Sequence, residues 1–197
     1  MFPWEHLAFG YLLYSVTVHV VDRRAPDGKR VIVLALATQI PDLVDKPLSW
    51  AFDVFTVGYG AAHSVLVVVP ALCVAGVVAA RSTLDGRTVA AYGVGHLSHL
   101  AGDLVYPVLR GEQVPVGRLL WPVASFPGPE TDVGLVERTL YYVLRYLYDI
   151  LTLDPSPLLL VQFGLLAAVG LLWLADGAPG PLACWRLLAA RLPHTAE

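Results

Sequence analysis

Two uninterrupted apolar stretches, at 64–80 and 156–175, constrain the fold of this 197-residue chain more than any other feature. Each approaches the roughly 20 residues that an α-helix needs to cross a bilayer, and neither contains a charged side chain. Hydrophobic residues make up 56% of the chain and charged residues only 15%, whereas about 25% of the residues of a soluble domain are charged. This surplus of apolar surface predicts an all-α membrane protein.

Three further stretches are apolar enough to be membrane spans, although polar residues interrupt them. We therefore predict a polytopic helical bundle of about five spans, at 5–21, 30–41, 63–80, 88–109 and 156–175. Between the last two spans, residues 110–152 form a loop rich in Pro and Gly and then a helix rich in Tyr and Leu, whose charges favour a position at the membrane interface. Residues 1–185 are assigned to one membrane-embedded domain and residues 186–197 to a polar tail.

The distribution of Lys and Arg predicts the orientation of these spans. With the N-terminus outside, the inner segments hold eight Lys and Arg residues and the outer segments hold five. Because inner loops carry the excess of basic residues, we expect a multi-pass protein of the inner or plasma membrane with its N-terminus on the outer face. A net charge of -3 gives no electrostatic case for nucleic acid as a partner.

On this topology, ionisable residues from four separate segments come to the outer face. They are His6, Asp42, Asp45, His63, His99 and Asp103. His99 and Asp103 are one helical turn apart and His96 lies one turn before His99, so the three share a helix face. Imidazole nitrogen and carboxylate oxygen both suit Zn²⁺. A bound cation offsets the roughly 2.5–3.5 kcal/mol that a carboxylate costs at membrane depth.

Each of these residues alone also fits a plainer role. An intramembrane His or Asp can bridge two helices by hydrogen bonds. Asp42 follows a proline and suits a cap or a turn, and Asp45 suits a solvated loop charge. His96 fits a metal ligand, a partner of a ligand or a packing residue equally well. His19 lies near the opposite membrane face and is interpreted as structural.

Several short motifs occur in a recognisable order. They are His6 on the first apolar segment, Pro41-Asp42 after the second, His63-Ser64 opening the third, Gly95-His96 through His99 to Asp103 in the fourth, and Leu119-Leu120-Trp121-Pro122 after it. Over residues 1–125 the chain thereby resembles the YdjM-like family of inner-membrane proteins, regarded as metal-dependent hydrolases. That family is in turn distantly similar to the zinc-dependent phospholipase C and single-strand nuclease superfamily.

The resemblance implies that Asp42, His63, His99 and Asp103 ligate one zinc ion, and that His6, with Asp103 as a bridge, helps to hold a second. Two departures stand out. The family's HRxxTHS stretch lacks its leading His and Arg, because this chain reads Gly58-Tyr59-Gly60-Ala61-Ala62-His63-Ser64. The family's PDxD reads PDLVD, with the second carboxylate at Asp45.

Two functions follow as hypotheses. The first is a membrane-bound hydrolase that cleaves a phosphoester or other ester of a lipid or lipid-linked molecule through a water activated by one or two divalent ions. Asp42 or Asp45, where not a ligand, would act as general base. The alternative is a non-enzymatic membrane protein, either a metal or proton carrier or a scaffold, whose His and Asp cluster bridges helices.

Overall fold

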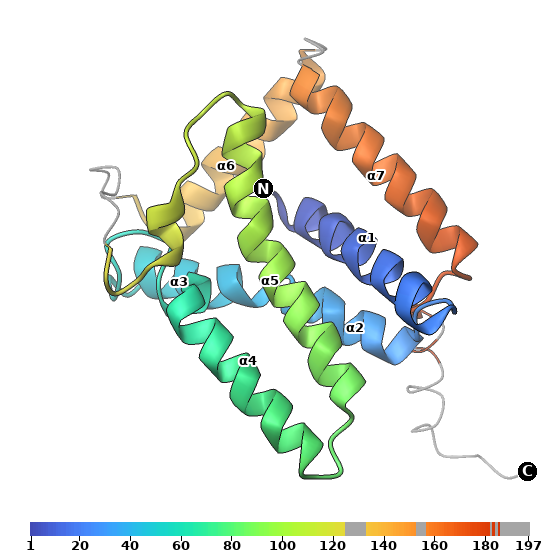
Figure 1. The fold of residues 1–197 in the computed structure, drawn as a ribbon. Helices are drawn as coiled ribbons and strands as arrows, with labels where there is room; N and C mark the ends of the chain where they lie inside the picture. Colours follow the sequence, from blue (N-terminus) through green and yellow to red (C-terminus); the bar gives the residue numbers. More distant parts are fainter. Residues whose placement is uncertain (125–132, 153–156, 182, 184, 186–197) are drawn as a thin grey trace, which may run out of the picture.

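The computed structural model describes residues 1–124, 133–152 and 157–181, together with residues 183 and 185. The regular secondary structure of these residues consists of helices, with no strand among them, which confirms the predicted all-α class. The α-helices are α1 (Pro3–Asp22), α2 (Gly28–Ala37), α3 (Ile40–Trp50), α4 (Val65–Ala80), α5 (Gly86–Leu109), α6 (Leu135–Leu151) and α7 (Pro157–Ala175), with short 3₁₀ helices η1 (Ala61–His63) and η2 (Val116–Leu119) (Figure 1).

Three of the helices begin at a side chain that caps their first turn. The Asp27 carboxylate accepts hydrogen bonds from two backbone N–H groups at the start of α2. Ser64 caps α4 and Asp85 caps α5 in the same way. These residue types are preferred at this position because their oxygens satisfy N–H groups that have no partner within the helix. The cap at Ser64 also fixes the point where η1 ends, next to His63.

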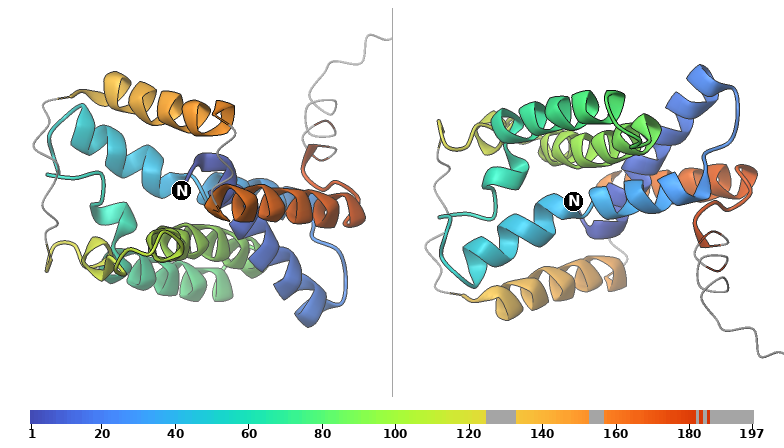
Figure 2. Two further views of the ribbon diagram at one scale, coloured as in Figure 1. Left: turned by 90° about the horizontal axis from the view of Figure 1, so that it is seen from above. Right: turned by 90° about the horizontal axis from the view of Figure 1, so that it is seen from below.

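Helix α5 lies at the centre of the fold and packs against α1, α2, α3 and α4 (Figure 1). Seen from above and from below, the helices form layers (Figure 2). Helices α4 and α5 lie side by side in one layer, α2 and α3 lie in the middle, and α6 packs on the side of α3 that faces away from α4 and α5. The junction between α2 and α3 therefore faces the middle of α5. This junction is where the ionisable residues gather.

The close contact between α2 and α5 requires glycine. A Cβ atom on Gly95 would lie 2.6 Å from the carbonyl oxygen of Leu34 and 2.9 Å from the Cβ of Ala37. A Cβ on Gly10 of α1 would lie 2.6 Å from Thr38 Cγ2. Such separations are below van der Waals contact, so any larger residue would push these helices apart. Leu34 and Ala37 are fully buried at this contact.

Helix α7 is attached to α1 through one carboxylate. Asp176 Oδ2 accepts hydrogen bonds from the Tyr11 hydroxyl and the Ser15 hydroxyl, both at 2.7 Å, and Oδ1 lies 2.7 Å from His19 Nε2. The three α1 residues are four apart, so they lie on one face of the helix. His19 thus makes a contact between helices, in agreement with its structural interpretation.

The predicted bundle of five membrane spans is wrong. Across the part of the chain that the structure describes, no helix is both long and apolar enough to cross a bilayer. The predicted span 30–41 is broken at Thr38 and Gln39, so α2 has only 10 residues, and α4 has 16. The longer helices α1 and α5 carry the buried ionisable side chains of the cluster, which lower their mean hydropathy. The multi-pass topology and the outer-face orientation derived from it therefore have no support in these helices.

A helix does occupy Leu135–Leu151, where one was predicted, and its position at a membrane interface stays a prediction. None of its residues is buried. The predicted polar tail at 186–197 lies outside the described residues.

The glycine contact gives a test of the helix packing. We expect Gly95→Ala to lower the free energy of unfolding by about 1–3 kcal/mol, because the new methyl group overlaps the backbone of α2. Gly93→Ala is the matched control on the same helix, since its Cβ would meet Leu72 at an ordinary 3.7 Å. That control should be neutral or stabilising by up to about 1 kcal/mol. Chemical unfolding in detergent measures both, and equal behaviour of the two variants would contradict the close packing.

Candidate metal centre

Four side chains from three elements converge between the layers. Asp42 stands in the first turn of α3, His63 ends η1, and His99 and Asp103 lie one turn apart on α5. One nitrogen or oxygen from each lies within 4.8 Å of those from the other three. His63 and His99 have no exposed surface and Asp103 is 6% exposed, while Asp42 is partly exposed. The sequence prediction that these four residues meet is confirmed.

The ring nitrogens of the two histidines face each other. His63 Nε2 lies 3.2 Å from His99 Nε2. Asp42 Oδ1 is 3.5 Å from His63 Nε2 and 3.6 Å from His99 Nε2. Asp103 Oδ2 lies 3.6 Å and 3.7 Å from the same two nitrogens. The four groups therefore surround one common point.

The partners of the two Nδ1 atoms, on the far side of each ring from the common point, indicate that each Nδ1 carries a proton. His99 Nδ1 lies 2.7 Å from the backbone carbonyl of Thr38, and a carbonyl only accepts, so Nδ1 donates. His63 Nδ1 lies 2.8 Å from Asp45 Oδ2, an ionised acceptor. In the neutral rings both Nε2 atoms then present lone pairs to each other. A proton on His63 or a metal ion between the two Nε2 atoms removes this repulsion, and orienting a ligand histidine through its other nitrogen is typical of metal sites.

Two more observations show that a metal ion fits. Asp42 Oδ1 is buried and has no hydrogen-bond partner, although a buried carboxylate oxygen rarely goes unpaired. Burial lowers the pKa of His63, but Asp42 and Asp45 outweigh it and raise that pKa above its ordinary value, so positive charge is favoured here. Two imidazoles and two carboxylates form a donor set that suits a divalent transition metal.

Asp45 lies behind His63 instead of in the cluster. It is fully buried and accepts hydrogen bonds from the backbone N–H groups of Gly60, Ala62 and His63, at 2.8, 3.2 and 2.9 Å. Burial alone raises the pKa of Asp45, but the hydrogen bonds from His63 and from this backbone hold it below its ordinary value. Its interpretation as a solvated loop charge is wrong, because it anchors η1 and orients the His63 ring. A role for Asp45 as general base stays a prediction.

His6 lies at the edge of the cluster. Its ring stacks on His99 with centroids 3.7 Å apart, and its Nε2 is 3.4 Å from Asp103 Oδ1. Neither of its ring nitrogens has a hydrogen-bond partner, and the side chain is 1% exposed. Burial lowers the pKa of His6 to about 4, so the ring is neutral at pH 7. The structure thus brings His6 next to Asp103, and their part in a second metal site stays a prediction.

His96 points away from the common point. Its Nε2 lies 2.8 Å from the carbonyl oxygen of Ala62, and its Nδ1 lies 3.3 Å from the Tyr92 hydroxyl. These contacts hold η1 against α5, in line with a positioning or packing residue. A role for His96 as a metal ligand stays a prediction that these contacts do not favour.

Sequence reasoning missed several neighbours of the cluster. Lys46 pairs with Asp42 Oδ2, and their spacing of four residues on one helix was the signal that could have revealed it. The Tyr59 ring meets His63 edge-on, with centroids 4.8 Å apart, and Arg118 lies over Tyr59. The backbone carbonyl of Thr38 was also missed. The contacts of Arg118 with Tyr59 and of Thr38 with His99 join residues about 60 positions apart, so no local pattern reveals them.

Metal content tests the cluster directly. We expect purified protein to contain a stoichiometric divalent metal by elemental analysis, and His99→Ala and Asp103→Ala to lose it, because each removes a ligand. His19→Ala is the matched control, since His19 contacts Asp176 at the other end of α1. Equal, near-zero metal in the wild type and all variants would exclude the site.

Asp45 gives a subtler test. We expect Asp45→Asn to retain metal but to weaken its affinity about 10- to 100-fold, because the amide orients His63 less strongly than the carboxylate does. Competition with a chelator measures the affinity. Complete loss of metal without loss of fold would instead make Asp45 a ligand, and unchanged affinity would remove its orienting role.

Comparison with known proteins places the chain in one family. A family model described as YdjM inner membrane protein matches residues 1–179, a range that holds the whole cluster and helices α1 to α7. Searches of curated proteins and of solved structures give no match. The resemblance to the YdjM family inferred from residues 1–125 is confirmed, and the description supports a membrane location. The relation to metal-dependent hydrolases and to the phospholipase C and nuclease superfamily stays a prediction. The chain belongs to the YdjM family of inner membrane proteins.

Proposed function

We propose that this protein is a metal-dependent hydrolase of the inner membrane that holds one zinc ion at Asp42, His63, His99 and Asp103. The observation that carries the proposal is that the Nε2 atoms of His63 and His99 lie 3.2 Å apart and both face two carboxylates. Each ring is oriented by a hydrogen bond at its Nδ1 atom. A second ion at His6 and Asp103 is part of the proposal. The reaction is hydrolysis of a phosphoester or another ester near the lipid headgroups.

The metal and the protein have separate tasks in this reaction. When bound, the ion supplies the Lewis acidity that makes water nucleophilic near pH 7 and polarises an ester oxygen. Thr38 and Asp45 hold the two imidazoles in the tautomer that ligation needs. Asp42 has Oδ1 toward the cluster, where it would hold the ion, and Oδ2 paired with Lys46. A role for Asp42 as general base is the alternative to ligation and would use the same oxygen.

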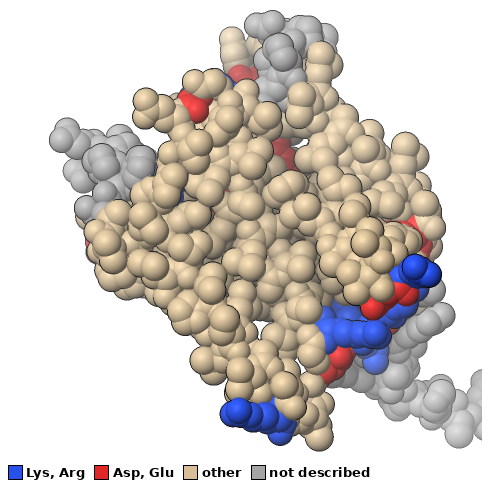
Figure 3. Space-filling model, in the orientation of Figure 1, with Lys and Arg blue, Asp and Glu red and all other residues tan. Residues whose placement is uncertain are grey.

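The surface of the protein supports a lipid or lipid-linked substrate. On the face shown in Figure 3, Lys and Arg gather near the turn between α1 and α2 and at the turn between α4 and α5, and few charges lie elsewhere. Many large apolar side chains are exposed, among them Trp4, Leu43 and Phe52 beside the elements that carry the cluster. Membership of an inner membrane family points to the same surroundings.

In a second possible role, the same cluster would bind a metal ion without catalysing a reaction. His63, His99 and Asp103 are almost completely buried, which suits an ion that is held for stability or passed along a carrier. Such a carrier or scaffold would bind metal as the hydrolase does. Only an activity measurement separates the two.

Hydrolysis is the deciding measurement. Metal-loaded protein in detergent should cleave at least one substrate from a set of phosphomonoesters, phosphodiesters and lipid esters. His99→Ala and Asp103→Ala should lower that rate by at least about 100-fold, because they remove the Lewis acid. His19→Ala should leave the rate unchanged. A chelator should abolish the activity and added Zn²⁺ should restore it. Stoichiometric metal with no hydrolysis of any class would instead support the carrier or scaffold.

A further inference from the structure

Basic side chains gather at the end of the molecule where α1 ends, α2 begins and α4 turns into α5. They are Arg23, Arg24, Lys29, Arg30, Arg81 and Arg87, and this region is called the basic end. Figure 3 shows its Lys and Arg residues as two groups at the same end of the visible face. The segments 20–30 and 81–88 hold these six cations and three carboxylates, so their net charge is +3, whereas the whole chain carries -3.

Ion pairs join the three helix ends that form the basic end. Arg30 Nη2 lies 2.9 Å from Asp85 Oδ2, which links the start of α2 to the turn before α5. Arg87 Nη2 lies 3.5 Å from Asp22 Oδ1, which links the start of α5 to the end of α1. Asp22 also pairs with Arg24 at 3.0 Å. Two of the three carboxylates are thus engaged with arginines, and the third caps α2. The basic end is therefore held together as one surface.

Three cations of the basic end keep an unbalanced charge. Arg23, Lys29 and Arg81 are exposed, and their side chains make no ion pair or hydrogen bond within the part of the chain that the structure describes. Arg23 ends α1 with a φ of 53°, in the left-handed region where glycine is the usual residue. An arginine there costs conformational energy, because its Cβ crowds the backbone. Its charge is available to a partner outside the chain.

Exposed apolar side chains stand beside these cations. Val20 and Val21, in the last turn of α1, are 73% and 72% exposed, and Leu84 is exposed in the turn between Arg81 and Arg87. Cations next to exposed aliphatic side chains match the boundary between the anionic headgroups and the acyl chains of a bilayer. Nucleic acid fits less well, because segments 20–30 and 81–88 contain no aromatic side chain on which a base could stack. Membership of an inner membrane family favours the same partner.

We propose that the basic end is a docking surface for the anionic phospholipid headgroups of the membrane. Arg23, Lys29 and Arg81 bind the headgroups, and the aliphatic side chains beside them contact the acyl chains. Each basic residue close to an anionic bilayer surface strengthens binding about 5-fold. None of these residues belongs to the metal cluster, so the proposal holds or fails independently of hydrolysis.

Lipid selectivity is the first test. Purified protein in dodecyl maltoside is titrated calorimetrically with mixed micelles that contain phosphatidylglycerol and, separately, phosphatidylcholine. We expect binding of phosphatidylglycerol to be at least about 10-fold tighter. This preference should shrink between about 0.1 and 1 M ionic strength, because salt screens exposed charges. Equal affinity for the two lipids, or a preference that salt does not alter, would overturn the proposal.

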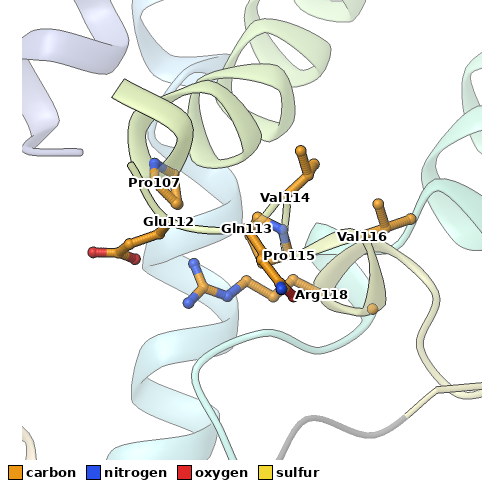
Figure 4. A pocket seen from close by; sticks show the side chains of 8 residues that line it. Pro107, Glu112, Gln113, Val114, Pro115, Val116 and Arg118 are labelled. Carbon is orange, nitrogen blue, oxygen red and sulfur yellow. The ribbon is translucent and has the colours of Figure 1, made fainter. Parts of the chain in front are cut away.

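Removal of charge locates the surface. The triple variant Arg23→Gln, Lys29→Gln and Arg81→Gln should lose the preference for phosphatidylglycerol, whereas Arg110→Gln should keep it. Arg110 is the matched control because it is exposed, pairs with Glu112 and lies at the other end of α5. That end is roughly 35 Å from the first turn of α5. Glu112 lines a cavity of about 460 Å³ there (Figure 4). A preference that the triple variant retains, or that the control loses equally, would overturn the proposal.

Arg23→Gly separates lipid binding from folding. Glycine relieves the left-handed backbone, so we expect this variant to unfold at the same or a higher temperature than the wild type. It should nevertheless bind phosphatidylglycerol about 5-fold more weakly, because it lacks one cation. Arg81→Lys keeps its charge and should bind as the wild type does. Lower thermal stability of Arg23→Gly with unchanged lipid binding would make Arg23 a structural residue and overturn the proposal.

An oligonucleotide tests the competing partner. Single-stranded DNA is titrated into the wild type and the triple variant under the same conditions. We expect it to bind more weakly than phosphatidylglycerol. Tighter binding of the oligonucleotide that depends on the same three cations would assign the basic end to nucleic acid and overturn the proposal.

Discussion

The contact between α2 and α5 at Gly95 is the constraint on which the rest of the centre depends. Without a Cβ at Gly95, the two backbones come together at Leu34. Thr38 lies one helical turn after Leu34, and His99 lies one turn after Gly95. The backbone carbonyl of Thr38 accepts a hydrogen bond from the His99 ring. The same approach therefore fixes the distance between two helices and the direction of an imidazole. Gly10 lets α1 join this contact against Thr38, which brings His6 onto the His99 ring.

The sequence predicted the cluster better than the architecture around it. His99 and Asp103 were predictable because their spacing on one helix is set by the helix itself, and Asp42 and His63 because short motifs placed them at the ends of segments. The break between α2 and α3 was not predictable from hydropathy, because residues 30–41 are apolar throughout most of their length. Membrane spans were inferred from the lengths of apolar stretches, and an apolar stretch does not show where a helix ends. The burial of Asp45 was missed because its partners are backbone N–H groups of a loop.

Tyr59 and Arg118 illustrate how tertiary structure changes the meaning of a motif. Tyr59 occupies the place of the arginine in the family's HRxxTHS stretch, and by sequence alone a cation is missing there. In the folded chain the guanidinium of Arg118, which comes from η2, lies against the ring of Tyr59. Positive charge thus stands near His63 from a different part of the chain. A local comparison of motifs does not show which side chains from distant loops lie beside a motif in the folded chain.

The attachment of Asp176 to α1 has a consequence for the whole chain. Tyr11, Ser15 and His19 bind one carboxylate near one end of α1, while His6, near the other end, rests on His99. Helix α1 is therefore held by side-chain contacts near both of its ends. Sliding along its axis or rotating about it would disturb a contact at each end. The helix therefore links the end of α7 to the ring that rests on His99.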